Sequence, residues 1–162
     1  IALTAKYDNL LVVQTFSKSR SMAGMRIGFC IGHPALIRCL NDVKFSFNSY
    51  TMSQVALACG VEAVKAERYF RETVRKIIDT REWAKRELSQ LGFEWTDSRT
   101  NFLFVRHPEK DAGELFELLK KERIYVRYFG GGRTSQYLRI TIGTQEEMGL
   151  LFAALKRIIQ DR

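Results

Sequence analysis

The chain has 162 residues, of which 46% are hydrophobic and 27% are charged, and its net charge is +8. This composition is typical of a globular protein and excludes an intrinsically disordered one. No apolar run approaches the roughly 18 residues of a transmembrane helix, so we expect no membrane association. The chain begins with Ile1 and lacks a charged-then-apolar leader, so we interpret its start as the middle of a longer protein.

The positive charge does not form a single block, because Lys and Arg alternate with Glu over residues 65–86. Such mixing is typical of solvated helix faces and argues against a nucleic-acid interface. Cys30, Cys39 and Cys59 are an odd number of cysteines without metal-ligand spacing. We interpret them as free, reduced and mostly buried, which is consistent with a cytoplasmic protein and predicts no metal site.

Residues 14–29 are the most informative stretch of the chain. The apolar runs at 10–13 and 27–31 predict two buried strands, over residues 10–15 and near 26–31, the first belonging to a parallel sheet. The polar turn between them places a hydroxyl, an ammonium and a guanidinium at Ser17, Lys18 and Arg26. An ordinary solvated loop is one interpretation. The other is a site for a phosphate ester, in which neighbouring cations make Lys18 an amine able to form a Schiff base.

Helical patterns follow this stretch. Pro34 suits the first turn of a helix over 35–43, and residues 45–50 predict an extended connector. Ser53 or Thr51 can cap a helix over 54–65, whose apolar residues we expect to be buried. These residues are Val55, Leu57, Ala58, Val61 and Val64. A long amphipathic helix is predicted over 67–91, with Gly92 as its stop signal.

Residues 92–162 predict a compact α+β unit. Its expected strands are 93–95, 101–106, 124–129 and 137–142, and its expected helices are 112–122 and 146–161. Thr144 and Glu147 have the spacing of a capping box. Alternation in the last strand places Arg139 on the face opposite Leu138 and Ile140. A solvated sheet face is the simplest explanation for that arginine.

The motifs at 15–18 and 23–29 resemble the lysine segment of fold-type I aminotransferases, and most of all the histidinol-phosphate aminotransferase branch. Residues 137–144 resemble a C-terminal motif of the same branch. The resemblance implies an α/β fold, with the end of a large cofactor domain followed by a small C-terminal α+β domain. The corresponding boundaries are 1–66 for the large-domain portion, 67–91 for an interdomain helix and 92–162 for the small domain.

The resemblance also implies site residues and partners. Lys18 would bind pyridoxal 5'-phosphate covalently and act in catalysis, while Ser17 and Arg26 would bind the cofactor phosphate. Arg139 would bind the carboxylate of a small anionic amino-acid or phosphate substrate, and Arg127 its other anionic end. A homodimer is implied as well. Relatives carry different residues where this chain has Arg20. Two interpretations of Arg20 therefore stay open: a solvated loop residue, or a residue that reaches toward the active-site mouth.

The resemblance covers less than half of a complete family member, so we expect the chain alone to be inactive. Histidinol phosphate and 2-oxoglutarate are the expected substrates of the full protein. An aromatic amino-acid aminotransferase and a threonine-phosphate decarboxylase remain alternatives within the same chemistry. A non-catalytic domain that binds an anion or a partner subunit is the alternative from another class.

Overall fold

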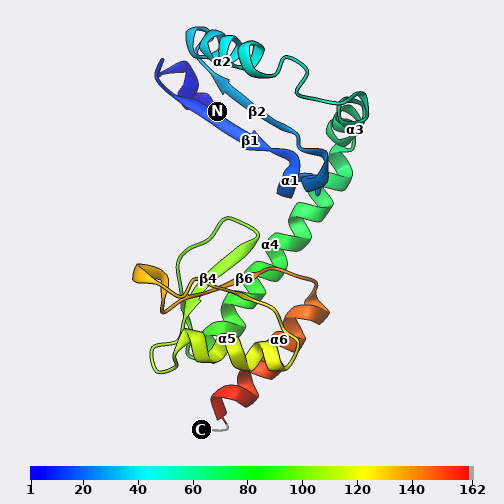
Figure 1. Cartoon of the computed structure of the whole chain (residues 1–162). Coiled ribbons are helices and arrows are strands. Elements are labelled where there is room, and N and C mark those ends of the chain that lie inside the picture. The colour runs from blue at the N-terminus through cyan, green and yellow to red at the C-terminus, as the bar shows by residue number, and fades with distance from the viewer. Residues whose placement is uncertain (161–162) are drawn as a thin grey trace. The chain divides into compact units, whose positions relative to one another are not determined.

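The computed structural model describes residues 1–160 (Figure 1). The chain divides into two compact units, an N-terminal unit (Ile1–Glu72) and a C-terminal unit (Thr73–Arg162). The predicted helix end at Asp161 and the predicted domain limit at 162 lie outside the described residues. None of the helices among residues 1–160 is long and apolar enough to cross a membrane.

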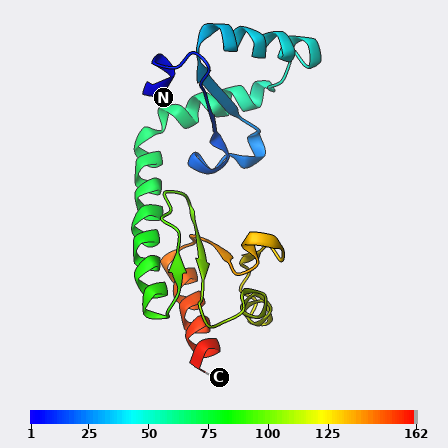
Figure 2. The ribbon, with the colours of Figure 1, turned by 90° about the vertical axis from the view of Figure 1, so that its left-hand side faces the viewer.

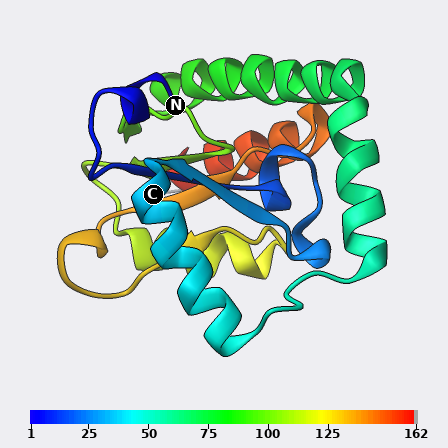
Figure 3. The ribbon, with the colours of Figure 1, turned by 90° about the horizontal axis from the view of Figure 1, so that it is seen from above.

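A two-stranded hairpin organises the N-terminal unit. The elements of this unit are η1 (Ala2–Ala5), β1 (Leu11–Thr15), α1 (Phe16–Ser19), η2 (Ala23–Met25), β2 (Gly28–Gly32), α2 (Pro34–Phe47), α3 (Gln54–Lys65) and the start of α4 (Glu67–Gln90). The strands β1 and β2 pair antiparallel, with Leu11 opposite Gly32 and Thr15 opposite Gly28 (Figure 3). Both strands occur near the predicted residues, but β1 pairs antiparallel with β2, where the sequence predicted a parallel sheet. Their expected burial was wrong, because each strand presents several exposed residues.

Helix α2 begins where Pro34 predicts it, but it is longer than expected. The His33 Nδ1 accepts a hydrogen bond from the Ala35 N–H at 3.3 Å, which makes His33 a capping residue. The helix continues to Phe47, so the extended connector predicted from residue 45 was wrong. Ser46 donates its hydroxyl to the Asp42 carbonyl at 2.7 Å, four residues earlier, as a helical serine can. The alternating Phe-Ser-Phe pattern had suggested extended backbone.

Helix α3 has the predicted bounds and the predicted cap, since the Ser53 Oγ accepts a hydrogen bond from the Ala56 N–H at 3.1 Å. Its predicted burial was wrong, because Ala56 is the one buried residue of the helix. The exposed apolar face of α3, defined by Leu57, Val61 and Val64, flanks an apolar groove of about 380 Å³. The cysteines follow the same trend: all three are free, but Cys39 and Cys59 are exposed rather than buried.

A four-stranded antiparallel sheet forms the centre of the C-terminal unit. The strand order is β3-β4-β6-β5, and α4 and α6 run alongside the strands (Figure 2). The elements that complete this unit are β3 (Glu94–Trp95), β4 (Phe102–Arg106), α5 (Ala112–Lys121), β5 (Arg127–Tyr128), η3 (Gly132–Thr134), β6 (Leu138–Thr141) and α6 (Gln145–Gln160). The predicted α+β arrangement is therefore confirmed, with β5 shorter than expected.

Helix α4 stops where the sequence predicts. Gly92 has a φ of +80°, a left-handed conformation that glycine adopts without steric cost. The Phe93 N–H then donates to the Leu88 carbonyl at 2.9 Å, which satisfies one of the last carbonyls of the helix. The chain can therefore turn directly from α4 into β3.

The inner face of the sheet packs against the helices to form the core of the C-terminal unit. Its most deeply buried side chains are Leu88, Leu103, Val105, Leu119, Leu138, Ile140 and Leu155. The buried residues of the strands, Leu103 and Val105 in β4 and Leu138 and Ile140 in β6, alternate with residues of the other face, as half-buried strands require.

Replacement of Leu103 by alanine is expected to destabilise the C-terminal unit by about 2–5 kcal/mol, because it leaves a cavity under a fully buried side chain. Denaturant unfolding, followed by the fluorescence of Trp83 and Trp95, measures this loss. Leu150→Ala is the matched control, since Leu150 is exposed on α6. Equal destabilisation by the two substitutions would contradict the assigned core.

Candidate active site

The turn between β1 and β2, which we call the lysine turn (residues 16–27), carries three of the predicted site residues. The Phe16 N–H donates to the Ile27 carbonyl at 3.0 Å and closes the turn at the end of the hairpin. Ser17 and Lys18 lie in the short helix α1, and Arg26 follows η2, two residues before β2 begins. The sequence therefore folds so that all three lie at the same end of the hairpin.

The lysine turn lies in a stretch without acidic residues, since no Asp or Glu occurs between Asp8 and Asp42. Among the residues that the structure describes, Lys18 has no carboxylate partner. Arg26 is exposed and donates one guanidinium N–H to the Ala23 carbonyl at 2.8 Å, which leaves its other N–H groups free. A hydroxyl, a primary amine and a guanidinium that form no ion pair with a carboxylate in the described structure suit an anionic phosphate ester.

The backbone of the lysine turn adopts unusual conformations. Ser21 and Arg26 each have a φ of +56°, in the left-handed region that residues with a Cβ rarely adopt. Such conformations cost about 1–2 kcal/mol each and persist only where surrounding contacts fix them. Backbone hydrogen bonds supply some of those contacts, because the N–H groups of Arg20 and Met22 both donate to the Phe16 carbonyl.

Arg20 is not the solvated loop residue that the sequence left open as one possibility. Its side chain is 16% exposed and pairs with Glu67 at 3.2 Å, at the start of α4. Hydrogen bonds from Arg71, and then from Arg20, hold the pKa of the Glu67 carboxyl below its ordinary value. Glu67 is therefore ionised at neutral pH, and the bond from Arg20 is charge-assisted on both sides.

Arg139 lies on the outer face of the C-terminal sheet, as its alternation with Leu138 and Ile140 predicted. Its guanidinium carbon lies 5.3 Å from the centre of the Phe102 ring and 5.6 Å from that of Phe129. The Arg139 Nε is buried and has no hydrogen-bond partner within the part of the chain that the structure describes. A buried donor without an acceptor is costly, which makes it a candidate contact for an anionic ligand.

Arg127 stands directly opposite Arg139 in the pairing of β5 with β6. Like charges in this position destabilise a sheet. The Arg127 guanidinium carbon also lies 5.3 Å from the centre of the Phe129 ring, so this aromatic ring contacts both arginines. Two facing guanidinium groups suit a ligand with at least one anionic group.

The structure thus brings Ser17, Lys18 and Arg26 together in the N-terminal unit, and Arg127 and Arg139 together in the C-terminal unit. The sequence analysis missed the two phenylalanines beside Arg139. Alternation along β4 would have placed Phe102 on the outer face, but its contact with Arg139 is visible only in the folded structure, where Phe102 pairs with Thr141. No three metal-ligating side chains are grouped within residues 1–160.

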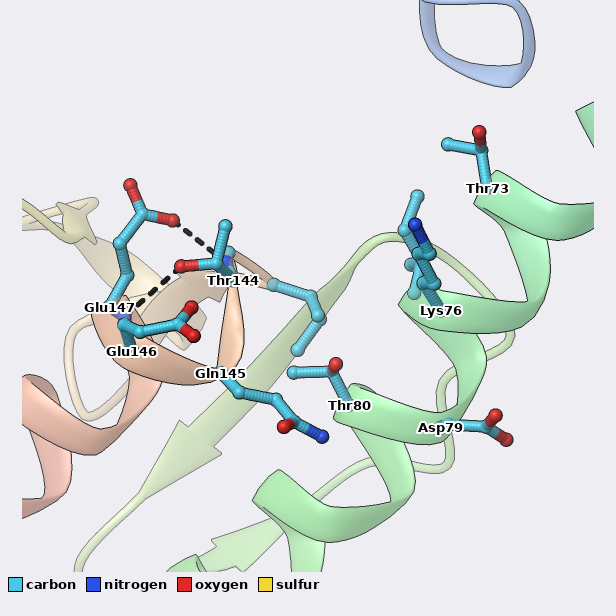
Figure 4. A pocket seen from close by; sticks show the side chains of 11 residues that line it. Thr73, Lys76, Asp79, Thr80, Thr144, Gln145, Glu146 and Glu147 are labelled. Carbon is cyan, nitrogen blue, oxygen red and sulfur yellow. Dashed lines mark hydrogen bonds between the residues drawn. The ribbon is translucent and has the colours of Figure 1, made fainter. Parts of the chain in front are cut away.

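A pocket of about 700 Å³ lies between α4 and the start of α6, and none of the predicted site residues lines it (Figure 4). The Thr144 N–H donates to the Glu147 carboxylate at 2.7 Å, and the Glu147 N–H donates to the Thr144 Oγ1 at 3.2 Å. This reciprocal pair confirms the predicted capping box. A Cβ at Gly143 would collide with the Glu147 carboxylate. The polar groups of this pocket therefore serve to start a helix.

Several known proteins are similar to this chain over nearly all of its length. The histidinol-phosphate aminotransferase of Brachyspira hyodysenteriae is 50% identical over 159 residues, which are 98% of this chain and 45% of that protein. Histidinol-phosphate aminotransferase 2 of Dechloromonas aromatica is 49% identical over 158 residues, or 98% of this chain and 44% of that protein. The chain thus spans less than half the length of the curated relatives it matches.

Solved structures show the same fold. The histidinol-phosphate aminotransferase from Clostridium acetobutylicum superimposes with a TM-score of 0.90 at 22% identity, over 99% of this chain and 49% of that one. The histidinol-phosphate aminotransferase from Sinorhizobium meliloti, solved in complex with pyridoxal-5'-phosphate, gives a TM-score of 0.81 at 28% identity, over 95% of this chain and 42% of that one. The expected α/β fold of a pyridoxal-phosphate-dependent transferase is therefore confirmed.

A family model described as aminotransferase class I and II matches residues 1–155. This match covers both the lysine turn and the sheet face that carries Arg127 and Arg139. The chain belongs to the class I and II aminotransferase family.

Proposed function

We propose that the chain is the C-terminal part of a pyridoxal-phosphate-dependent aminotransferase. The complete polypeptide would exchange an amino group between histidinol phosphate and 2-oxoglutarate. One observation carries the proposal: Lys18 lies in an acid-free turn beside Ser17 and Arg26, within a chain 50% identical to a histidinol-phosphate aminotransferase. The residue types in the lysine turn and the activity named for this relative point to the same function.

The residues of the lysine turn fit the cofactor. Pyridoxal phosphate, when bound, supplies an aldehyde that joins a primary amine and a ring that withdraws electrons from it. Lys18 offers the amine, and its free Nζ is not neutralised by a neighbouring carboxylate. Ser17 and Arg26 would hold the phosphate through a hydroxyl and the free N–H groups of a guanidinium.

Lys18 has a second role in this proposal. Its Nζ would take the proton from the α-carbon of the amino donor and return it later, as a general base and then a general acid. An amine that moves protons in this way must be released from other partners, and the described structure gives Lys18 none.

Arg139 would bind the α-carboxylate of 2-oxoglutarate, or the phosphate that histidinol phosphate carries in its place, through its guanidinium, including the Nε that now lacks an acceptor. Arg127 would bind the same phosphate, or the distal carboxylate of 2-oxoglutarate. An anion between them would relieve the repulsion of two facing arginines.

The remaining length of the polypeptide completes the enzyme in this proposal. Residues 1–66 belong to the cofactor domain, 67–91 to the interdomain helix and 92–162 to the small domain. The rest of the large domain would cover the exposed apolar face of α3, and the complete protein would be a cytoplasmic homodimer. The chain alone would be inactive, because it holds less than half of a relative's length.

The test is a substrate panel on the complete polypeptide with pyridoxal phosphate and 2-oxoglutarate. We expect kcat/KM for histidinol phosphate to exceed that for phenylalanine by at least about 100-fold, because a phosphate dianion can pair with both arginines, whereas the single carboxylate of phenylalanine leaves one unpaired. Glutamate formation is the readout. Preference for phenylalanine, or release of carbon dioxide from threonine phosphate, would replace the proposed substrate with one of the alternatives.

A further inference from the structure

Arg20 connects the lysine turn to the junction between α3 and α4. One of its N–H groups donates to the Ala63 carbonyl at 2.8 Å, and another donates to the Glu67 carboxylate at 3.2 Å. Its guanidinium carbon lies 3.8 Å from the centre of the Phe70 ring. Three contacts to residues more than 40 positions away thus hold a side chain that is 16% exposed.

Arg20 bonds to the end of α3 and to the start of α4, on either side of the break between these helices. Ala63 lies in the last turn of α3, where carbonyl groups have no partner within the helix. Glu67 is the first residue of α4, where a negative charge is favoured by the helix dipole. A planar guanidinium can reach both acceptors at once, and lysine cannot make the same pair of bonds.

The same residue is tied by its backbone to the helical turn that holds Lys18. The Arg20 N–H donates to the Phe16 carbonyl at 3.2 Å, and the Ser21 N–H donates to the Lys18 carbonyl at 3.3 Å. Lys18 is therefore two residues from an anchored side chain, inside a turn that holds two left-handed residues. Loss of the anchor would leave that strained turn without its long-range support.

We propose that Arg20 is a positioning residue that fixes the lysine turn against the junction of α3 and α4. The inference rests on the proposed role of Lys18. Arg20 does not bind the cofactor phosphate or the substrate in this assignment, because the two ends of its guanidinium are occupied by Ala63 and Glu67. Its effect on chemistry is transmitted through the backbone between residues 16 and 21.

The test compares Arg20→Met and Arg20→Lys with the control Arg71→Met in the complete polypeptide. Arg71 pairs with the same carboxylate at 2.9 Å, but its side chain is 77% exposed and it belongs to α4 itself. Amide hydrogen exchange without cofactor is the first readout. We expect Arg20→Met to raise exchange roughly five- to thirtyfold in peptides covering 16–22 and 63–70.

Arg71→Met is expected to leave the 16–22 peptide at the wild-type rate, and Arg20→Lys to give an intermediate rate. The second readout is the affinity for pyridoxal phosphate, followed by the visible absorption of the bound cofactor, which we expect Arg20→Met to weaken about tenfold. Wild-type exchange of residues 16–22 in Arg20→Met would overturn the inference. So would an equal effect of Arg71→Met, or a rise spread evenly over the whole chain.

These outcomes separate the inference from the proposed function. Absence of a visible band in the wild-type protein would reject the role of Lys18 in cofactor binding. Hydrogen exchange would still report whether Arg20 holds the turn, because it needs no cofactor.

Discussion

Replacement of Lys18 by alanine in the complete polypeptide is expected to abolish the visible absorption of bound pyridoxal phosphate and to reduce kcat by roughly 10²–10⁴-fold, the range that a positioned proton-transfer group supplies. The physical reason is the loss of the one primary amine in the lysine turn. Stability should change little, because the Lys18 side chain is exposed and makes no ion pair in the described structure. Absorption spectra measure the loss of the cofactor band, and single-turnover kinetics measure the loss of rate.

Lys6→Ala is the matched control for this experiment. Lys6 is also exposed in the N-terminal unit, but it lies outside the lysine turn. The control should retain both the absorption band and the rate. A Lys18→Ala protein with a wild-type spectrum would show that another amine binds the cofactor.

Replacement of Arg139 by methionine is expected to reduce kcat/KM by roughly 30- to 3,000-fold, which corresponds to the ~2–5 kcal/mol lost when one partner of a buried charge pair is removed. The loss should appear with the amino donor and with 2-oxoglutarate, since both carry an anionic group. Arg139→Lys should recover only part of it, because an ammonium lacks the planar fork. Steady-state kinetics with each substrate give the measurement.

Stability provides the second half of this prediction. The Arg139 Nε is buried without a partner, and Arg127 faces it across the sheet. Methionine removes the unsatisfied donor and the repulsion together, so we expect the melting temperature to stay the same or rise. Arg106→Met is the control: it breaks a 2.7 Å ion pair with Glu94 on the same sheet and should leave kcat/KM unchanged. A large fall in stability with Arg139→Met would assign that arginine a structural role instead.

Local patterns in the sequence predicted several elements and their ends correctly. The stop at Gly92, the cap at Ser53 and the reciprocal bonds of Thr144 with Glu147 each depend on residues within a few positions of one another. Alternation in β6 also gave the correct face for Arg139. Such features are fixed by short-range sterics and hydrogen bonding, which a single sequence contains.

Features that depend on distant partners could not be predicted. The apolar pattern of α3 shows that one face favours burial, but it does not show what covers that face, and in this chain the face is exposed. Arg20 looked like a loop residue because its partners lie 43 and 47 positions later. Phe129 reaches Arg139 through strand pairing, and register is not visible in either strand alone.

The exposed apolar face of α3 has a further consequence for the assembled enzyme. Leu57, Val61 and Val64 gain little enthalpy when they are covered near room temperature, because burial of apolar side chains is driven there by the entropy of water. That driving force weakens on cooling. In the proposed complete polypeptide, the contacts that cover this helix are therefore expected to be weaker near 0 °C than at room temperature.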